Sequence, residues 1–254
     1  FRAMNRGAWA LAIAGAAGCG EVFEAPVELD VTRDVSGFAQ VQLDLAAPAE
    51  IRGGLGRELS IQGDLVVTAA TQARADELAE TYAVETSSAA EPYRITVPIP
   101  GDFVQTPFPE ASVRGNLRIT VPADVDLVVL EQGGALRVRG VRGQIDLQAR
   151  GAVLIEEVVN NAKVAAASGG ARVETRLRAG TNLDVTAVRG PVNVVLPPSP
   201  SVRITARAGE GRQVVVQHPD LPRRPGRRSY EVTAGGGSAS VVADAFADNV
   251  LLLP

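Results

Sequence analysis

The sequence is poor in the residues on which most catalytic and metal sites depend. Among 254 residues it has one cysteine, Cys19, and one histidine, His218. A single cysteine excludes a disulfide within the chain, and a single histidine excludes most histidine-dependent catalysis and most transition-metal sites. No Gly-x-Ser-x-Gly motif, no P-loop and no Gly-x-Gly-x-x-Gly turn is present either. We therefore expect no enzyme activity, no metal and no cofactor.

Aromatic residues are also scarce. They make up 4% of the chain, whereas hydrophobic residues as a whole make up 46%. Small aliphatic side chains suit a thin, regular core between stacked strands, where a large ring would disturb the layer spacing. The net charge of −4 gives no overall attraction to nucleic acid. We therefore expect a β-rich core and no nucleic-acid partner.

The apolar run Ala8–Gly18 is too short for a transmembrane helix, which needs about 20 residues. It follows the basic start Met4-Asn5-Arg6 and ends Ala16-Ala17-Gly18-Cys19, which resembles the lipobox of bacterial lipoproteins. The resemblance implies that 1–18 is a lipoprotein signal peptide, that Cys19 carries the lipid, and that 19–26 is a tether. The alternative is an ordinary signal peptide, which would leave Cys19 without a lipid.

A repeat occupies the stretch from Gly115 to Gln217. Short runs of alternating apolar and polar residues recur there, separated by Gly, Asn or Pro. Alternation sends every second side chain to the same face of a strand. The predicted inward set is Leu136, Val138, Ile145, Leu147, Val153, Ile155, Leu183, Val185, Val192, Val194, Val202 and Ile204, and the outward set is Arg137, Asp146, Leu154, Asp184, Asn193 and Arg203. Glycines also return once per two runs, at Gly134, Gly151, Gly170 and Gly190.

This pattern predicts an all-β protein built as a β-solenoid. Each turn of about 19 residues would lay two short strands, stacked in parallel on the turn before. The competing fold is an antiparallel meander or sandwich, since short strands at regular spacing fit that too. Hairpins would favour Asn-Gly or Asp-Gly turns, and the repeat has none. We expect the array to span 113–254, with the last run, Val250–Leu253, sealing its open end.

Residues 27–112 predict a β-rich N-terminal cap for this array. Strands at 27–32 and 38–45 would form a strand–turn–strand start, and another strand is expected at 93–97. A helix is expected over 72–84, with Thr71 as its N-cap, because apolar residues there follow a helical period. Residues 101–112 should form an ordered surface loop.

The chain from Val27 to the C-terminus resembles the bacterial putative-adhesin domain family, uncharacterised envelope proteins with a β-solenoid fold. The resemblance rests on three features. These are the helix inside Thr-Ala-Ala-Thr…Ala-Asp-Glu-Leu-Ala, the run Leu117-Arg-Ile-Thr-Val-Pro-Ala-Asp-Val-Asp-Leu entering the repeats, and the Gly-x-Val-x-Val pattern through Val195-Leu-Pro. It implies an envelope location and a binding or structural role. It implies no catalytic residues.

The sharpest charge cluster is a basic loop with four arginines, Arg223, Arg224, Arg227 and Arg228. Guanidinium groups pair bidentately with phosphate, so this loop is a candidate site for lipid headgroups, an anionic envelope glycan or another envelope protein. A plain solvated loop is the alternative. A second, weaker candidate is the set of outward arginines Arg137, Arg139, Arg142 and Arg150, which are interleaved with acids as soluble surfaces are.

The acidic and amide pairs carry weaker signals. Asp124 and Asp126 should face outward on one strand, where two carboxylates could serve as an acid/base pair or calcium ligands, or only keep the strand solvated. We expect Glu156-Glu157 and Asn160-Asn161 at a turn, and Asn161 and Asn182 stacked as a structural ladder.

These observations favour a non-catalytic, lipid-anchored protein of the bacterial cell envelope that acts as an adhesin or a structural scaffold. Two alternatives stay open. One is a polysaccharide-processing enzyme, because β-solenoids also house lyases and hydrolases. The other is an envelope assembly or signalling factor that docks a partner through the basic loop.

Overall fold

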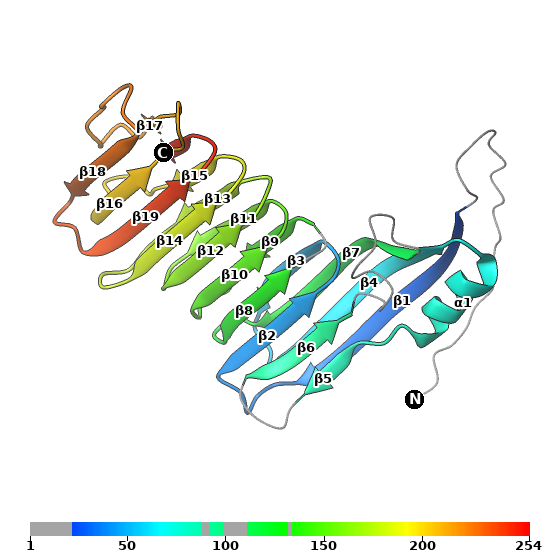
Figure 1. The fold of residues 1–254 in the computed structure, drawn as a ribbon. Coiled ribbons are helices and arrows are strands. Elements are labelled where there is room, and N and C mark those ends of the chain that lie inside the picture. Colours follow the sequence, from blue (N-terminus) through cyan, green and yellow to red (C-terminus); the bar gives the residue numbers. More distant parts are fainter. Residues whose placement is uncertain (1–21, 88–91, 99–110, 132–133) are drawn as a thin grey trace.

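The computed structural model describes residues 22–87, 92–98, 111–131 and 134–254, and in these ranges the protein is mostly β (Figure 1). Its strands form two ten-stranded sheets, here named sheet A and sheet B. Sheet A has the strand order β1 (Phe23–Asp34), β4 (Glu58–Ala69), β7 (Ala111–Pro122), β3 (Ala49–Gly54), β9 (Leu136–Arg139), β11 (Val153–Val158), β13 (Ala171–Thr175), β15 (Val192–Val195), β20 (Val250–Leu253), β17 (Val214–Val216). Sheet B has the order β18 (Ser229–Ala234), β16 (Val202–Arg207), β19 (Ala239–Ala245), β14 (Asn182–Ala187), β12 (Ala162–Ala166), β10 (Ile145–Ala149), β8 (Asp126–Glu131), β2 (Gln40–Leu45), β6 (Tyr93–Val97), β5 (Glu85–Ser87).

From β8 to β15, consecutive strands alternate between the two sheets. From β10 on, each of them pairs in parallel with the strand two before it, as β10 does with β8 and β11 with β9. The register steps along sheet A run from Leu136 to Val153, Ala171 and Val192, which are steps of 17, 18 and 21 residues. Parallel stacking of two-strand units, predicted from the repeat, is thereby confirmed, and an antiparallel meander is excluded for this part of the chain.

The core lies between the two sheets and is almost entirely aliphatic. Every residue of the predicted inward set is buried, and Val138, Leu147, Ile155, Val185 and Val194 are fully so. Each such side chain contributes about 1.5–3 kcal/mol when it leaves water. The small volume of these side chains lets strands of opposite sheets approach evenly, so one continuous core extends through the stack.

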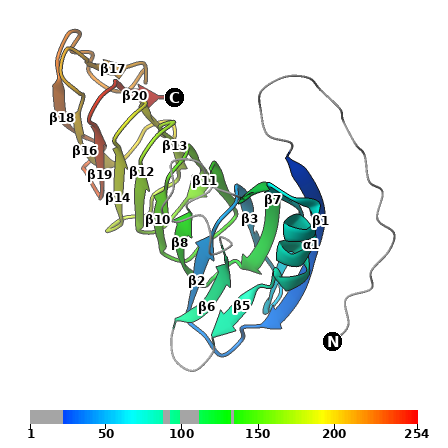
Figure 2. The same ribbon diagram turned by 45° about the vertical axis from the view of Figure 1, so that its right-hand side comes forward.

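The N-terminal part carries the antiparallel strands and the helix. β1, β4 and β7 are long and pair antiparallel at one end of sheet A, and α1 (Gln72–Thr81) packs against β1 and β4 (Figure 2). Thr71 is the N-cap, as predicted, because its side chain accepts a hydrogen bond from the Arg74 amide. The helix ends earlier than predicted, since Tyr82 is extended and donates its hydroxyl hydrogen bond to the Pro98 carbonyl. No helix in the described ranges is both long and apolar enough to cross a membrane.

The predicted strand–turn–strand start is present, but its two strands do not pair with each other. β1 lies in sheet A and β2 in sheet B, so the turn at 35–39 carries the chain from one sheet to the other. Residues 23–26, expected in the tether, belong to β1. β2 and β3 bond in parallel to β8 and β9, which places the early strands in the same two sheets as the repeats. Of the loop expected at 101–112, residues 101–110 lie outside the described residues. Residues 111–112 are the first two of β7.

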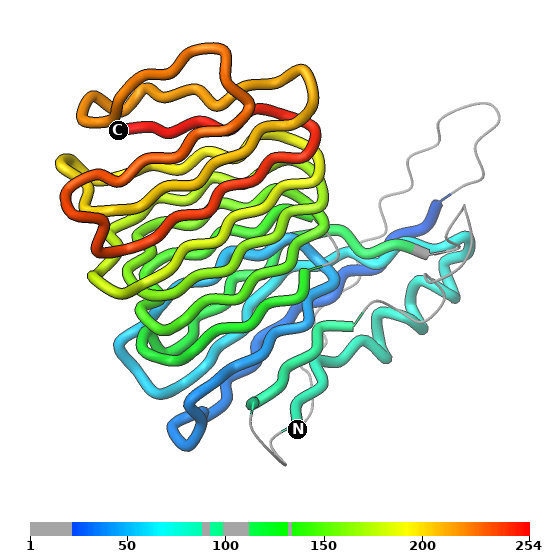
Figure 3. Tube along the Cα trace, turned by 60° about the vertical axis from the view of Figure 1, so that its left-hand side comes forward, coloured from blue at the N-terminus to red at the C-terminus, as the bar shows by residue number. Residues whose placement is uncertain are grey.

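The C-terminal strands occupy a different place from the one predicted. We expected Val250–Leu253 to seal the end of the array, but β20 lies between β15 and β17, and β19 lies between β14 and β16. Figure 3 shows this red segment enclosed between yellow and orange turns. The connector before β16 contains Pro197, Pro198 and Pro200. It places β16 two strand positions beyond β14 in sheet B, and β19 later occupies the position between them. β20 occupies the corresponding position between β15 and β17 in sheet A.

Candidate functional site

The basic loop, residues 217–228, connects β17 and β18 at the end of the stack opposite β1 and β5. Its four arginines are all exposed. None of them takes part in an ion pair among the described residues. Four neighbouring positive charges therefore face solvent without a neutralising acid.

A buried histidine holds the start of this loop. His218 is buried, its Nε2 lies 3.1 Å from the Pro197 carbonyl oxygen, and its Nδ1 accepts from the Asp220 amide at 3.2 Å. These two contacts fit the neutral tautomer in which Nε2 carries the proton. The Asp220 carboxylate in turn accepts from the Ser199 amide at 2.9 Å. The single histidine is thus a structural anchor, and nothing in its contacts points to catalysis.

The rest of the loop is fixed through its backbone. Tyr230, which is buried, donates its hydroxyl to the Pro222 carbonyl at 3.0 Å, and burial raises the pKa of this hydroxyl. The carbonyls of Arg227 and Arg228 accept from the amides of Val214 and Ala208, each at 2.8 Å. The backbone that carries the arginines therefore has little freedom, while their side chains remain open to an anion.

The basic loop also closes the array. Leu221 of the loop is buried. β17 is the edge strand of sheet A, and its Val214 amide points away from β20. This amide donates a hydrogen bond to the Arg227 carbonyl of the loop. On sheet B, β18 pairs antiparallel with β16 and ends the parallel stack. An antiparallel strand and an anchored loop therefore perform the sealing that we expected of Val250–Leu253.

Three of the four weaker arginine candidates take part in ion pairs. Arg137 pairs with Glu156, Arg139 with Glu50, and Arg142 with Asp124. The side-chain hydrogen bond from Arg52 is the main reason that the pKa of Glu50 lies below its ordinary value. Arg150 is exposed, and its carbonyl accepts from Ser168. This surface carries alternating positive and negative side chains in ion pairs, as the interleaving of arginines and acids in the sequence indicated.

Asp124 and Asp126 lie at a polar corner hollow of about 710 Å³ between the ends of sheet A strands and the starts of sheet B strands. Asp124 lies in the turn before β8, not on the strand as predicted. It accepts from Arg142 at 2.9 Å, and Asp126 accepts from the Gln144 amide at 2.8 Å. In the described ranges no three His, Cys, Asp or Glu side chains gather as a metal site requires. Both carboxylates therefore tie one level of the stack to the next.

Glu156 and Glu157 do not form the predicted turn. They lie inside β11, where Glu157 has φ 64° and the register shifts between Ile155 and Val158. This is a β-bulge, which inserts an extra residue and leaves the strand otherwise intact.

Asn160 and Asn161 do lie at the following turn, as expected. The Asn161 side-chain oxygen accepts from the Asn182 amide at 2.9 Å, so the predicted ladder is confirmed, and the Ser240 hydroxyl extends it by bonding Asn182.

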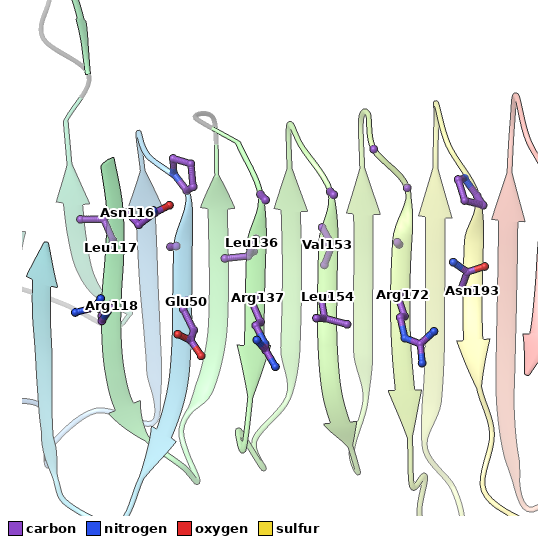
Figure 4. Close-up of a pocket in the computed structure, with 18 residues that line it drawn as sticks. Glu50, Asn116, Leu117, Arg118, Leu136, Arg137, Val153, Leu154, Arg172 and Asn193 are labelled. Carbon is purple, nitrogen blue, oxygen red and sulfur yellow. The ribbon is translucent and has the colours of Figure 1, made fainter. Parts of the chain in front are cut away.

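A groove on sheet A was not predicted from the sequence. It has a volume of about 620 Å³ and crosses the outer face near the starts of β3, β9, β11, β13 and β15. Figure 4 shows Arg118, Glu50, Arg137, Leu154, Arg172 and Asn193 in a row along it. The sequence contains these residues at outward positions, but only the strand register places them side by side.

The predicted lipid-anchor residue, Cys19, lies outside the described residues, so the anchor stays a prediction.

Comparisons with known proteins found matches among solved structures. No family model matches the chain, and no curated protein matches it. Similar solved structures include a putative cell adhesion protein from Clostridium sporogenes, with TM-score 0.49 and 11% identity over 90% of this chain and 99% of that one. A putative lipid binding protein from Parabacteroides distasonis has TM-score 0.33 and 9% identity over 90% and 97% of the two chains. A putative adhesin from Bacteroides fragilis has TM-score 0.29 and 7% identity over 89% and 97%. Bacterial proteins described as putative adhesins are thus among the structural neighbours of this chain, over about nine tenths of its length.

Proposed function

We propose that this protein is a non-catalytic lipoprotein of the bacterial cell envelope, in which a β-solenoid scaffold tethered through Cys19 presents the basic loop to a phosphate-bearing partner. One observation carries the proposal: four guanidinium groups without an acidic partner stand on a backbone that is held by hydrogen bonds at the end of the stack opposite β1. Because the backbone of the loop is already held, binding of phosphate oxygens by these guanidinium groups would require little further ordering of the main chain.

The position of the loop supports presentation at a distance from the anchor. Sheet A has ten strands, and neighbouring strands lie about 4.8 Å apart, so the loop stands on the order of 40 Å from the end that holds β1. The tethered N-terminus leads into β1, and the opposite end is therefore the one that reaches outward when the stack stands upright.

Binding to phosphate groups tests the loop. The probes are vesicles of phosphatidylglycerol mixed with phosphatidylcholine, and a soluble polyphosphate chain, with pure phosphatidylcholine as the neutral reference. We expect Arg223, Arg224, Arg227 and Arg228→Gln together to weaken binding at least about a hundredfold, since each basic residue near an anionic surface contributes about 1 kcal/mol. The matched control changes four exposed arginines elsewhere, Arg33, Arg57, Arg178 and Arg189→Gln, and should retain binding. Equal losses in both variants would contradict the loop site.

The anchor is tested by fractionation of bacteria that express the full chain. Wild-type protein should sediment with membranes, and Cys19→Ala should move to the soluble fraction, because the acyl chains contribute about 0.8 kcal/mol for each buried CH₂. A variant that still sediments with membranes would contradict the lipid anchor.

The polysaccharide-processing alternative gains no support from the acids that the sequence singled out. Asp124 is engaged by Arg142 and Asp126 by the Gln144 amide, and both serve the stacking of turns. The assembly or signalling alternative uses the same loop and differs only in its partner, which the loop variant would also disrupt.

A further inference from the structure

The groove on sheet A, introduced above, has a floor of small residues and one charged wall. Its floor is formed at the strand starts, where Pro48, Ala135, Ala152, Gly170 and Pro191 leave space above the backbone. Its wall is the outward row in Figure 4. The groove runs across the strands, so a ligand in it would meet one strand after another at a spacing of about 4.8 Å.

The arginines of this wall lie on every second strand. In the strand register, Glu50 of β3 lies beside Arg118 of β7 on one side and beside Arg137 of β9 on the other. Leu154 of β11 likewise lies between Arg137 of β9 and Arg172 of β13. Cations therefore recur at about 9.5 Å, two strand steps apart. The positions between them hold an acid, Glu50, and an apolar side chain, Leu154.

Ion pairs orient two of these arginines without using up their donors. Arg137 contacts Glu156 through Nη2, and Arg172 contacts Glu174 through Nη2 at 3.2 Å. Both acids lie one outward position further along the strands, away from the floor residues. A guanidinium carries five N–H donors, so each arginine keeps donors free for a ligand. Arg118 is exposed and takes part in no ion pair among the described residues.

We propose that this groove binds a linear anionic polysaccharide that lies across the strands and carries one carboxylate or sulfate on every second sugar. Two sugar rings of an extended chain span about the same distance as two strand steps, so successive charged sugars would meet Arg118, Arg137 and Arg172. Neutral sugars would lie between them, with Leu154 against one ring and Glu50 accepting hydroxyl hydrogens. Arg52 and Arg139 already pair with Glu50, and Leu154 is uncharged, so the extra charges of a polymer charged on every sugar would find no free cation at the intermediate positions. This inference deepens the proposed scaffold function and is independent of the basic loop.

The test measures binding of three oligosaccharides to the purified full chain in mild detergent. A hyaluronan octasaccharide carries a carboxylate on alternate sugars, a galacturonate octamer carries one on every sugar, and a chito-oligosaccharide is neutral. We expect hyaluronan to bind most tightly and the neutral chain most weakly. Added salt should weaken hyaluronan binding, because these contacts are exposed to solvent.

Variants locate the site. Arg118, Arg137 and Arg172→Gln together should weaken hyaluronan binding at least about thirtyfold. Ala152→Leu should also weaken it, because the larger side chain fills the floor without changing the charge. The control, Arg33, Arg57 and Arg178→Gln, removes the same charge from exposed positions outside the groove and should bind as wild type. Circular dichroism and thermal unfolding should be unchanged in all of them.

Each other outcome is decisive. Unchanged binding in the groove variant would overturn the inference, and so would tighter binding of the galacturonate octamer. If the variant with four substitutions in the basic loop loses hyaluronan while the groove variant keeps it, the groove is not the site and the loop is. If the groove variant alone loses hyaluronan while the loop variant keeps its phosphate affinity, the groove inference stands and the loop proposal fails.

Discussion

Replacing Leu252 tests the unexpected position of the C-terminal strand. Leu252 is fully buried, and the register places it between Val194 of β15 and Val216 of β17. A buried Leu→Ala change costs about 2–5 kcal/mol, and the cost is larger where the surroundings cannot collapse into the cavity. Strands on both sides restrain such a collapse, so we expect Leu252→Ala to cost about 3–4 kcal/mol.

The matched control is the next residue, Leu253, which points to the opposite face and is only half-buried. Leu253→Ala should cost no more than about 1 kcal/mol, since its side chain leaves little cavity. Both variants are compared with wild type by guanidinium unfolding followed by far-UV circular dichroism, and an unchanged slope shows that the change lies in stability. If Leu252→Ala costs no more than Leu253→Ala, β20 does not lie inside the stack and the topology described above is wrong.

Two further predictions concern close stacking and burial. A Cβ at Gly151 would collide with the carbonyl of Gly134 on the preceding turn, so Gly151→Ala should destabilise by about 1–3 kcal/mol in the same unfolding assay. Gly37→Ala, where no atom lies near, should not, and equal effects would contradict tight corner stacking. Burial raises the pKa of Tyr82 to about 12, so its contribution to stability should be complete below pH 10 and decline as the pH rises toward 12. Titration of the tyrosine ultraviolet absorbance should show an ionisation at high pH that is missing in Tyr82→Phe. The same titration curve in both proteins would contradict the burial of Tyr82.

The faces of the strands could be predicted because they depend on neighbours in the sequence. Leu136, Arg137 and Val138 alternate, and an extended backbone turns successive side chains to opposite sides whatever the tertiary structure. The same local logic gave the N-cap at Thr71. It failed at Glu156-Glu157, because a bulge keeps the strand going where two polar residues suggested a turn.

The candidate sites depended on the tertiary structure to different degrees. The basic loop was visible as four arginines within six residues, but its anchoring by His218 and Tyr230 was not. The arginine row of the groove was invisible, since Arg118, Arg137 and Arg172 are far apart in the sequence and meet only through the register.

The sequence by itself determined that the chain forms short strands with an aliphatic inner face and a polar outer face, since side-chain alternation and turn residues act locally. That these strands pair in parallel was favoured by the repeat and established by the strand pairing. Only the tertiary structure decided which strand lies beside which. Strands such as Val214–Val216 and Val250–Leu253 are both short and aliphatic, and either could pair with β15. The order β15–β20–β17 is accompanied by contacts between residues that are distant along the chain. These are the hydrogen bonds of Ser238 with Ser201 and those that anchor the basic loop.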